Sequence, residues 1–202
     1  MRSLLLHVHE EPRFDARLQV ALDLARAFEG HLTLYHAIPF TMTMPGDPFS
    51  VTAAALAPVV RAHAEEFRHK VEARLAVEDV PWDWIGEYGV AGPGLVEHAG
   101  LADLAIVGAG NSDGRKGASR LAGMLAIQCR APVLVVPDGA EVIGADGPAV
   151  VAWNGSLEAA RALRSAVPLL EKASAVTLIE VADSSTADTD LPAREGARYL
   201  DR

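Results

Sequence analysis

Two groups of residues in this 202-residue chain have types and spacing that could do chemistry. The first is a glycine-rich polar stretch, in which Gly108, Gly110 and Asn111 lead toward Ser119 and Arg120. Where such a stretch joins a strand to a helix, backbone N–H groups and the helix N-terminus point at one spot and can hold a phosphate. Any strand-to-helix connection also uses glycine, so a plain loop is the alternative interpretation.

The second group consists of His7 and His9, two residues apart at the end of an apolar run. If this run is a strand, alternation places both imidazole rings on one face. A metal pair is geometrically feasible, but no carboxylate or cysteine cluster completes a ligand set at suitable spacing, so we predict no metal site. A contact from His9 to a small ligand, or a buried histidine with satisfied hydrogen bonds, is favoured.

Composition limits the kinds of partner. Half of the residues are hydrophobic, and the net charge of −9 argues against nonspecific binding to nucleic acid or to a membrane surface. A small anionic ligand stays compatible, because backbone amides supply local positive potential. The single Cys129 excludes an intrachain disulfide and fits a reducing compartment. The N-terminal apolar run is too short for a signal peptide, and no run could span a membrane. We therefore expect a cytoplasmic protein.

Strand-like and helix-like segments alternate along the chain. Strands are expected at residues 3–9, 31–38, 82–88, 103–108 and 132–137, and helices at residues 14–28, 51–78, 92–101 and 121–130. The first and fifth strands are continuous apolar runs, which is typical of a parallel sheet buried on both faces by helices. The third places Trp82, Trp84 and Tyr88 on one face by alternation. Pro58 lies inside the long second helical pattern and predicts a kink or a helix start near it.

A second strand–helix–strand unit follows a glycine- and acid-rich linker. Its strands are expected at 149–153 and 175–182, with a helix at 156–170. Ala16-Arg17 and Thr33 have the same spacing as Ala160-Arg161 and Thr177, which indicates an internal repeat. Elements matching the third to fifth strands do not follow. We predict a domain at 1–137, a linker at 138–147 and a partial second copy at 148–202.

These features resemble the universal stress protein family. The resemblance rests on Val107-Gly108-Ala109-Gly110 after the fourth strand, on a helix running into Ala131-Pro132-Val133-Leu134-Val135-Val136-Pro137, and on residues 151–162 as the start of a second copy in tandem members. It implies an α/β fold of the adenine-nucleotide alpha-hydrolase-like type, an open five-stranded parallel sheet with helices on both faces, followed here by a partial β-α-β second copy. It also implies pairing through the last strand and, in many members, an ATP site.

The resemblance also implies which residues form that site. In ATP-binding members an acidic residue ends the first strand, adenine lies near the end of the second, and the phosphates lie on a Gly-x-x-Gly turn and a later Gly-Ser/Thr pair. The corresponding residues here are His9, Ala37, Ile38, Gly108, Gly110, Asn111, Ser119 and Arg120. His9 replaces the acid, Asn111 replaces the second glycine, and Ser119-Arg120 replaces the Gly-Ser/Thr pair. ATP or AMP is the ligand that this degenerate motif implies.

We therefore interpret the chain as a universal-stress-type protein with a small-nucleotide-responsive or scaffolding role in the stress response. The sequence contains no Walker-type P-loop and no His-Glu-x-x-His motif, and we predict no catalytic residues. Two alternatives stay open: a nucleotide-hydrolysing enzyme of the same fold, and a dimerisation module that binds no nucleotide. The apolar fifth strand is expected to form a homodimer or an intramolecular pseudo-dimer.

Overall fold

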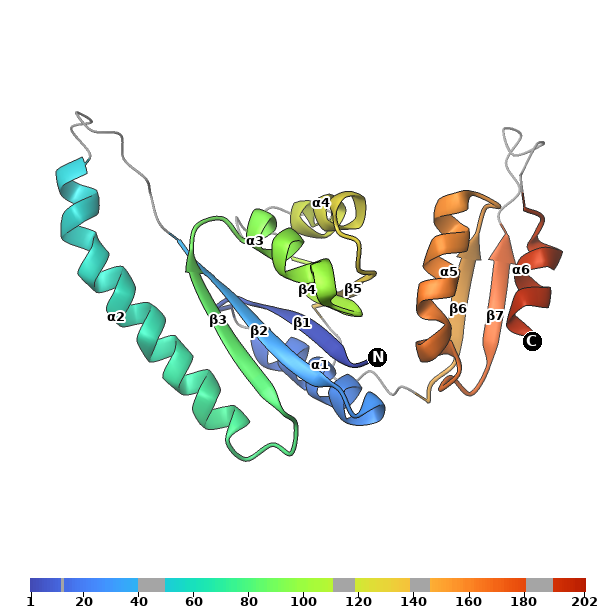
Figure 1. Cartoon of the computed structure of the whole chain (residues 1–202), viewed down its shortest axis with the longest axis horizontal. Helices are drawn as coiled ribbons and strands as arrows, with labels where there is room; N and C mark the ends of the chain where they lie inside the picture. The colour runs from blue at the N-terminus through green and yellow to red at the C-terminus, as the bar shows by residue number, and fades with distance from the viewer. Residues whose placement is uncertain (12, 40–49, 111–118, 139–145, 181–190) are drawn as a thin grey trace. The chain divides into compact units, whose positions relative to one another are not determined.

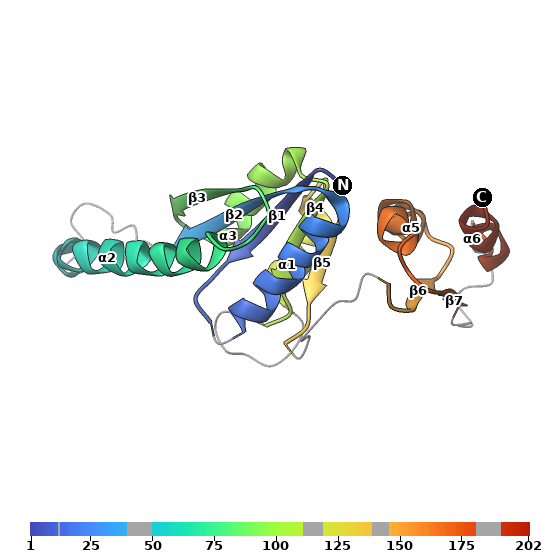
Figure 2. The same cartoon turned by 90° about the horizontal axis from the view of Figure 1, so that it is seen from below.

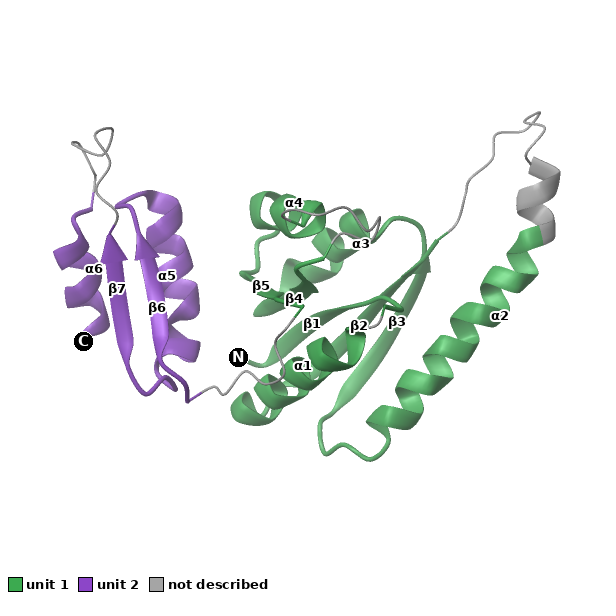
Figure 3. Ribbon diagram, turned by 180° about the vertical axis from the view of Figure 1, so that it is seen from behind, with its two compact units in different colours: residues 1–142 green, residues 143–202 purple. Residues whose placement is uncertain are grey.

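The computed structural model describes residues 1–11, 13–39, 50–110, 119–138, 146–180 and 191–202 (Figure 1). They form two compact units, one within residues 1–142 and the other within residues 143–202 (Figure 3). The boundary between the units falls inside the segment 138–147. Among the described residues no helix is long and apolar enough to cross a membrane.

Unit 1 is organised around a five-stranded parallel sheet with the strand order β3-β2-β1-β4-β5. The strands are β1 (Ser3–Val8), β2 (His31–Ile38), β3 (Trp82–Tyr88), β4 (Leu104–Gly108) and β5 (Val133–Val136). The chain moves outward from β1 to β3 and then crosses back to β4 on the other side of β1. The carboxyl ends of β1 and β4 are therefore the point at which the strand order reverses.

Four α-helices and one short 3₁₀ helix connect these strands. They are α1 (Phe14–Phe28), α2 (Ser50–Leu75), α3 (Ala91–His98), η1 (Ala99–Leu101) and α4 (Arg120–Gln128). Right-handed crossovers place α1 and α2 on one face of the sheet and α3 and α4 on the opposite face (Figures 1 and 2). The predicted fold class, an open five-stranded parallel sheet with helices on both faces, is confirmed.

The continuous apolar strands are explained by this two-sided burial. Leu4, Leu5 and Leu6 of β1 are consecutive, and each is at most 2% exposed. Leu5 packs under α3 and α4 in a cluster that includes Leu95 and Leu125. Its neighbours in β1 point to the other face, as strand alternation requires. A strand with helices on both sides has no polar face to signal alternation.

Several predicted boundaries shift, each for a local reason. Strand β1 ends at Val8, one residue before His9. Helix α2 begins at Ser50, so Pro58 lies inside the helix and does not start it. The left-handed residue that ends α1 is Glu29, with φ of 50°, while the Gly30 N–H donates to the Ala25 carbonyl. The predicted range 14–28 coincides with α1.

Unit 2 is a two-stranded parallel sheet with two helices. Its elements are β6 (Ala149–Trp153), α5 (Leu157–Leu170), β7 (Val176–Glu180) and α6 (Ala193–Leu200). Ser156 caps α5, because its Oγ accepts a hydrogen bond of 3.1 Å from the Ala159 N–H. The order of the first three elements is the strand–helix–strand order predicted for residues 148–202.

Candidate functional site

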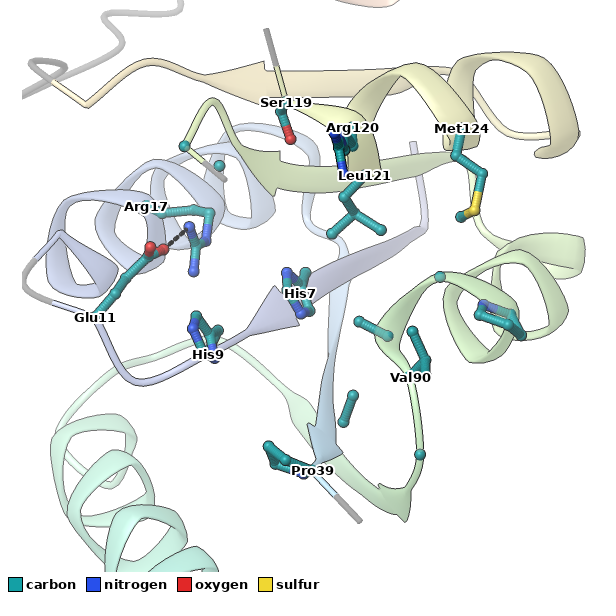
Figure 4. Close-up of a pocket in the computed structure, with 17 residues that line it drawn as sticks. His7, His9, Glu11, Arg17, Pro39, Val90, Ser119, Arg120, Leu121 and Met124 are labelled. Carbon is teal, nitrogen blue, oxygen red and sulfur yellow. Dashed lines mark hydrogen bonds and ion pairs between the residues drawn. The ribbon is translucent and has the colours of Figure 1, made fainter. Parts of the chain in front are cut away.

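A cavity of about 540 Å³ opens in unit 1 at the carboxyl ends of β1, β2 and β4 (Figure 4). Open α/β sheets place ligands at this edge, in the crevice where the strand order reverses. The N-terminal ends of α3 and α4 border the same cavity through Ala91, Gly92 and Arg120. Helix N-termini carry unpaired N–H groups and partial positive charge, so this edge favours an anion.

One part of the cavity wall is polar. It contains Gly108 at the end of β4, together with Ser119 and Arg120 at the start of α4. Ser119 is the N-cap residue of α4, and its Oγ accepts a hydrogen bond of 3.3 Å from the Ala122 N–H. This bond fixes the direction in which the first turn of α4 meets the cavity.

Another part of the wall is apolar. Ala37 and Pro39 come from the end of β2, and Val90 comes from the segment that joins β3 to α3. Figure 4 shows Pro39 and Val90 on the side of the cavity away from Ser119 and Arg120. Because the polar and apolar walls face each other, the cavity suits a ligand with an apolar part and an anionic part.

An ion pair between buried Arg17 and half-buried Glu11 lies at the side of the cavity formed by β1 and α1. Arg17 of α1 is 4% exposed, and its Nη1–H donates a hydrogen bond to Oε1 of Glu11 within an ion pair. The Nε and Nη2 atoms of Arg17 are also buried, and neither has a hydrogen-bond partner within the described part of the chain. The guanidinium lies so close to Gly108 that a Cβ atom added to this glycine would collide with Nη1. Gly108 therefore makes room for Arg17.

His7 and His9 line the cavity beside this ion pair. Both rings lie on one side of the chain, as predicted from alternation, and they are stacked, with a 6.2 Å centroid separation and a 2° angle between ring planes. Burial, together with the positive charges of Arg17 and of neighbouring histidines, lowers the pKa of His7 to about 3. No group of three or more possible metal ligands occurs among the described residues.

A second hollow lies against His9, between the end of β2 and α2. It is lined by His36, His63 and Phe67, among others, and Nε2 of His63 is 2.7 Å from Oε2 of Glu10. The His36 ring makes edge contacts with the rings of Phe67 and Trp84. Burial, and then the nearby His9, lower the pKa of His36 to about 4.

The structure brings together six of the eight residues expected from the sequence. His9, Ala37, Gly108, Gly110, Ser119 and Arg120 all line the cavity. Ile38 lines the second hollow, because alternation in β2 turns it away from Ala37. Asn111 lies outside the described residues.

Arg17 and Glu11 also line the cavity, although neither was predicted as a site residue. Glu11 lies near the expected ligand edge, where solvation alone would explain an acidic side chain. No Gly-x-Ser-x-Gly motif was expected, but Gly110-Asn111-Ser112-Asp113-Gly114 has these letters. Ser112 lies outside the described residues.

The two buried histidines predict how the stability of unit 1 depends on pH. The pKa values of His7 and His36, about 3 and about 4, lie below the ordinary value of 6.5. Below pH 6.5 the unfolded chain therefore binds more protons than the folded chain, and the free energy of unfolding falls as pH falls. Each histidine contributes about 1.4 kcal/mol per pH unit until its folded pKa is reached.

Urea unfolding between pH 7.5 and pH 5, followed through NMR signals of unit 1, measures this slope. We expect His7→Asn to remove about half of the histidine-dependent slope, since one of two equal contributions is lost. His69→Asn, the same change at an exposed residue of α2, is the matched control. An unchanged slope in the His7 variant would contradict the prediction.

Comparisons with known proteins support the fold. No protein-family model matches the chain, and no curated protein matches it. Among solved structures, universal stress protein UspA from Lactobacillus plantarum is 17% identical, with a TM-score of 0.58, over 67% of this chain and 97% of that protein. A universal stress protein family member from Burkholderia pseudomallei is 19% identical, with a TM-score of 0.51, over 67% of this chain and 95% of that protein.

A universal stress protein from Archaeoglobus fulgidus matches more of the chain. It is 15% identical, with a TM-score of 0.69, over 91% of this chain and 68% of that protein. At such identities the likeness establishes the fold, and this chain has the fold of the solved universal stress proteins.

Proposed function

We propose that this chain is a universal-stress-type protein that binds an adenine nucleotide, AMP or ATP, in the cavity of unit 1. The observation that carries the proposal is the arrangement of the cavity wall. Gly108, Ser119 and Arg120 stand on one side of it, and apolar Ala37, Pro39 and Val90 stand on another. A nucleotide has the same division, with an anionic phosphate end and a flat, largely apolar base.

The polar side supplies what a phosphate needs. The first turn of α4 presents backbone N–H groups, and Gly108 at the end of β4 leaves space for the Arg17 guanidinium at the cavity. Arg17 adds a buried positive charge on the adjoining wall. The phosphates would therefore lie between β4 and the start of α4.

The apolar side supplies what a base needs. Ala37 and Pro39 at the end of β2 and Val90 before α3 offer nonpolar surface to the ring. His9, which stands where the family has an acid, lines the same cavity and offers ring nitrogens to the polar edges of the base or sugar. A nucleotide-responsive role in stress follows from such a site, and Asn111 remains a proposed phosphate contact.

We also propose that the molecule pairs through β5 and that residues 148–202 are a partial second copy. Strand β5 is an edge strand of the sheet, and its Val135 is 39% exposed. An apolar edge strand with open N–H and C=O groups is a ready pairing surface. Sedimentation velocity at several protein concentrations tests pairing, and a monomer throughout would exclude a homodimer.

Calorimetric titration with AMP and with ATP tests the nucleotide proposal. We expect the unmodified protein to bind at least one of them at millimolar concentration or below, and Gly108→Ala to weaken binding by about tenfold or more. The added Cβ would displace Arg17 and close the approach to the backbone. Gly123→Ala adds the same methyl group to α4 in open space and is the matched control.

The absence of binding by both nucleotides at millimolar concentration would overturn the proposal. Equal binding by the Gly108→Ala and Gly123→Ala variants would instead place the phosphates elsewhere. Measuring phosphate release from ATP in the same samples distinguishes a binding protein from a nucleotide-hydrolysing enzyme.

A further inference from the structure

Arg17 is held in an incompletely satisfied state. A guanidinium has five N–H donors in a planar fork. Within the described residues, Glu11 is the ion-pair partner of Arg17. Glu11 meets Nη1, while the buried Nε and Nη2 atoms find no acceptor in the described chain. Leaving buried donors unpaired is unfavourable, and more so for a charged group. Unpaired buried donors of this kind are typical of a site that binds a ligand with hydrogen-bond acceptors.

The surroundings of Arg17 hold it at the cavity. Its guanidinium carbon lies 5.8 Å from the centre of the Phe14 ring. Gly108 at the end of β4 leaves space for its Nη1 atom. In Figure 4 the guanidinium extends from α1 toward the interior of the cavity, above His7 and His9. The low pKa of His7 keeps that ring neutral near pH 7, so it does not compete with Arg17 for an anion.

Glu11 differs from Arg17 in its freedom to move. Its side chain is 30% exposed, whereas that of Arg17 is 4% exposed, and it lies in the segment between β1 and α1. The contact is made through one donor and one acceptor and is not a two-point fork. A phosphate or carboxylate that engages two donors of a guanidinium binds it more strongly than a single-point partner does.

We propose that the Glu11 carboxylate is an internal competitor, which occupies Arg17 in the ligand-free protein and is replaced there by the anionic group of the ligand. Arg17 is then a binding residue for that anionic group, and competition from Glu11 lowers the affinity with which the group binds. The inference rests on the proposed nucleotide function for the identity of the ligand, but it extends to any small anion of phosphate type.

The exchange has a distinctive consequence. Removing a residue that contacts the ligand weakens binding, whereas removing a competitor strengthens it. Glu11→Gln should therefore bind a phosphate-bearing ligand more tightly than the unmodified protein, while Arg17→Gln should bind it more weakly. The affinity for adenosine, which has no phosphate, should not depend on the charge of Glu11.

The test is calorimetric titration of the full chain with AMP, adenosine and inorganic phosphate. We expect Glu11→Gln to raise the affinity for AMP and for phosphate by about fivefold or more. We expect Arg17→Gln to lower both affinities by about tenfold or more. Adenosine affinity should change less than about twofold. Glu10→Gln removes the same charge from the adjacent residue, which pairs with His63 and not with Arg17, and should leave all three affinities within about twofold.

The outcomes separate the two proposals. If AMP binds the unmodified protein and Glu11→Gln binds it equally or more weakly, the competitor proposal is overturned and the nucleotide function stands. If no nucleotide binds but phosphate binding responds to Glu11 and Arg17 as stated, the nucleotide function fails and the competitor stands. Binding of neither probe overturns both. Circular dichroism checks that each variant folds, and Glu11→Gln decides the question by itself if Arg17→Gln does not fold.

Discussion

Replacing Leu125 by alanine is expected to lower the free energy of unfolding of unit 1 by about 2–5 kcal/mol. Leu125 is fully buried and is the buried residue of α4 in the described structure. It packs with Leu5, Leu95 and Val107 in the cluster beneath α3 and α4. Truncation removes the transfer free energy of the side chain and leaves a cavity between the helix and the sheet. Urea unfolding followed through NMR signals from β1 and β4 measures the loss.

The same substitution should weaken nucleotide binding. Helix α4 presents Ser119 and Arg120 to the cavity, and Leu125 anchors it to the sheet. Ile127→Ala is the matched control, since Ile127 is 85% exposed on the same helix and should change stability by about 0.5 kcal/mol or less. Equal effects of the two substitutions would show that α4 is not held in this way.

The fold was largely predictable because its strands carry an unambiguous signal. The predicted ranges 31–38, 82–88 and 149–153 coincide with β2, β3 and β6, and the other strand predictions differ by one or two residues at their ends. A strand such as β1, which is buried on both faces, is apolar along almost its whole length, so its length can be read directly. Strand β3 is less buried, and alternation of Trp82, Trp84 and Tyr88 indicates it instead. Helix ends were predicted less well, since α2 ends at Leu75 and α4 at Gln128, three and two residues before their predicted ends.

The cavity was only partly predictable from the sequence. Glycine after a strand and a capping residue before a helix are local signals, so Gly108 and Ser119 could be found. Arg17 lies on an otherwise ordinary amphipathic helix, and its burial depends on β4, far away in the chain. Such a contact has no local signal. Arg161, which has the matching position in the predicted repeat, is exposed.

Ile38 shows how a motif carried over from a family can mislead. The family places adenine at the end of the second strand, which suggested both Ala37 and Ile38. Strand alternation allows only one of two consecutive side chains to face a given cavity. Ala37 faces the candidate site, and Ile38 faces the hollow near His36.

Replacing Trp153 by alanine is expected to unfold unit 2 while unit 1 stays folded. Among the described residues of unit 2, Trp153 and Leu163 are the buried large hydrophobic residues. The Trp153 ring packs against Gly196 of α6, and its Nε1–H donates a hydrogen bond of 2.9 Å to the Leu191 carbonyl. Losing a buried tryptophan lowers the free energy of unfolding by about 3–5 kcal/mol. A unit with such a small core has a total free energy of unfolding of only a few kcal/mol, so this loss is expected to unfold it.

Hydrogen exchange followed by mass spectrometry resolves the two units by peptide. In Trp153→Ala, amides of β7 and α6 should exchange at the rate of an unfolded chain, and amides of β1 and β4 should keep their protection. Val150→Ala is the matched control, because Val150 is in the same strand but 66% exposed, so its loss should change little. Retained protection of β7 and α6 would show that Trp153 does not hold unit 2 together. Each unit is expected to have a separate hydrophobic core and to unfold independently. Lost protection of β1 and β4 would contradict this expectation, because it would show that the two units unfold together.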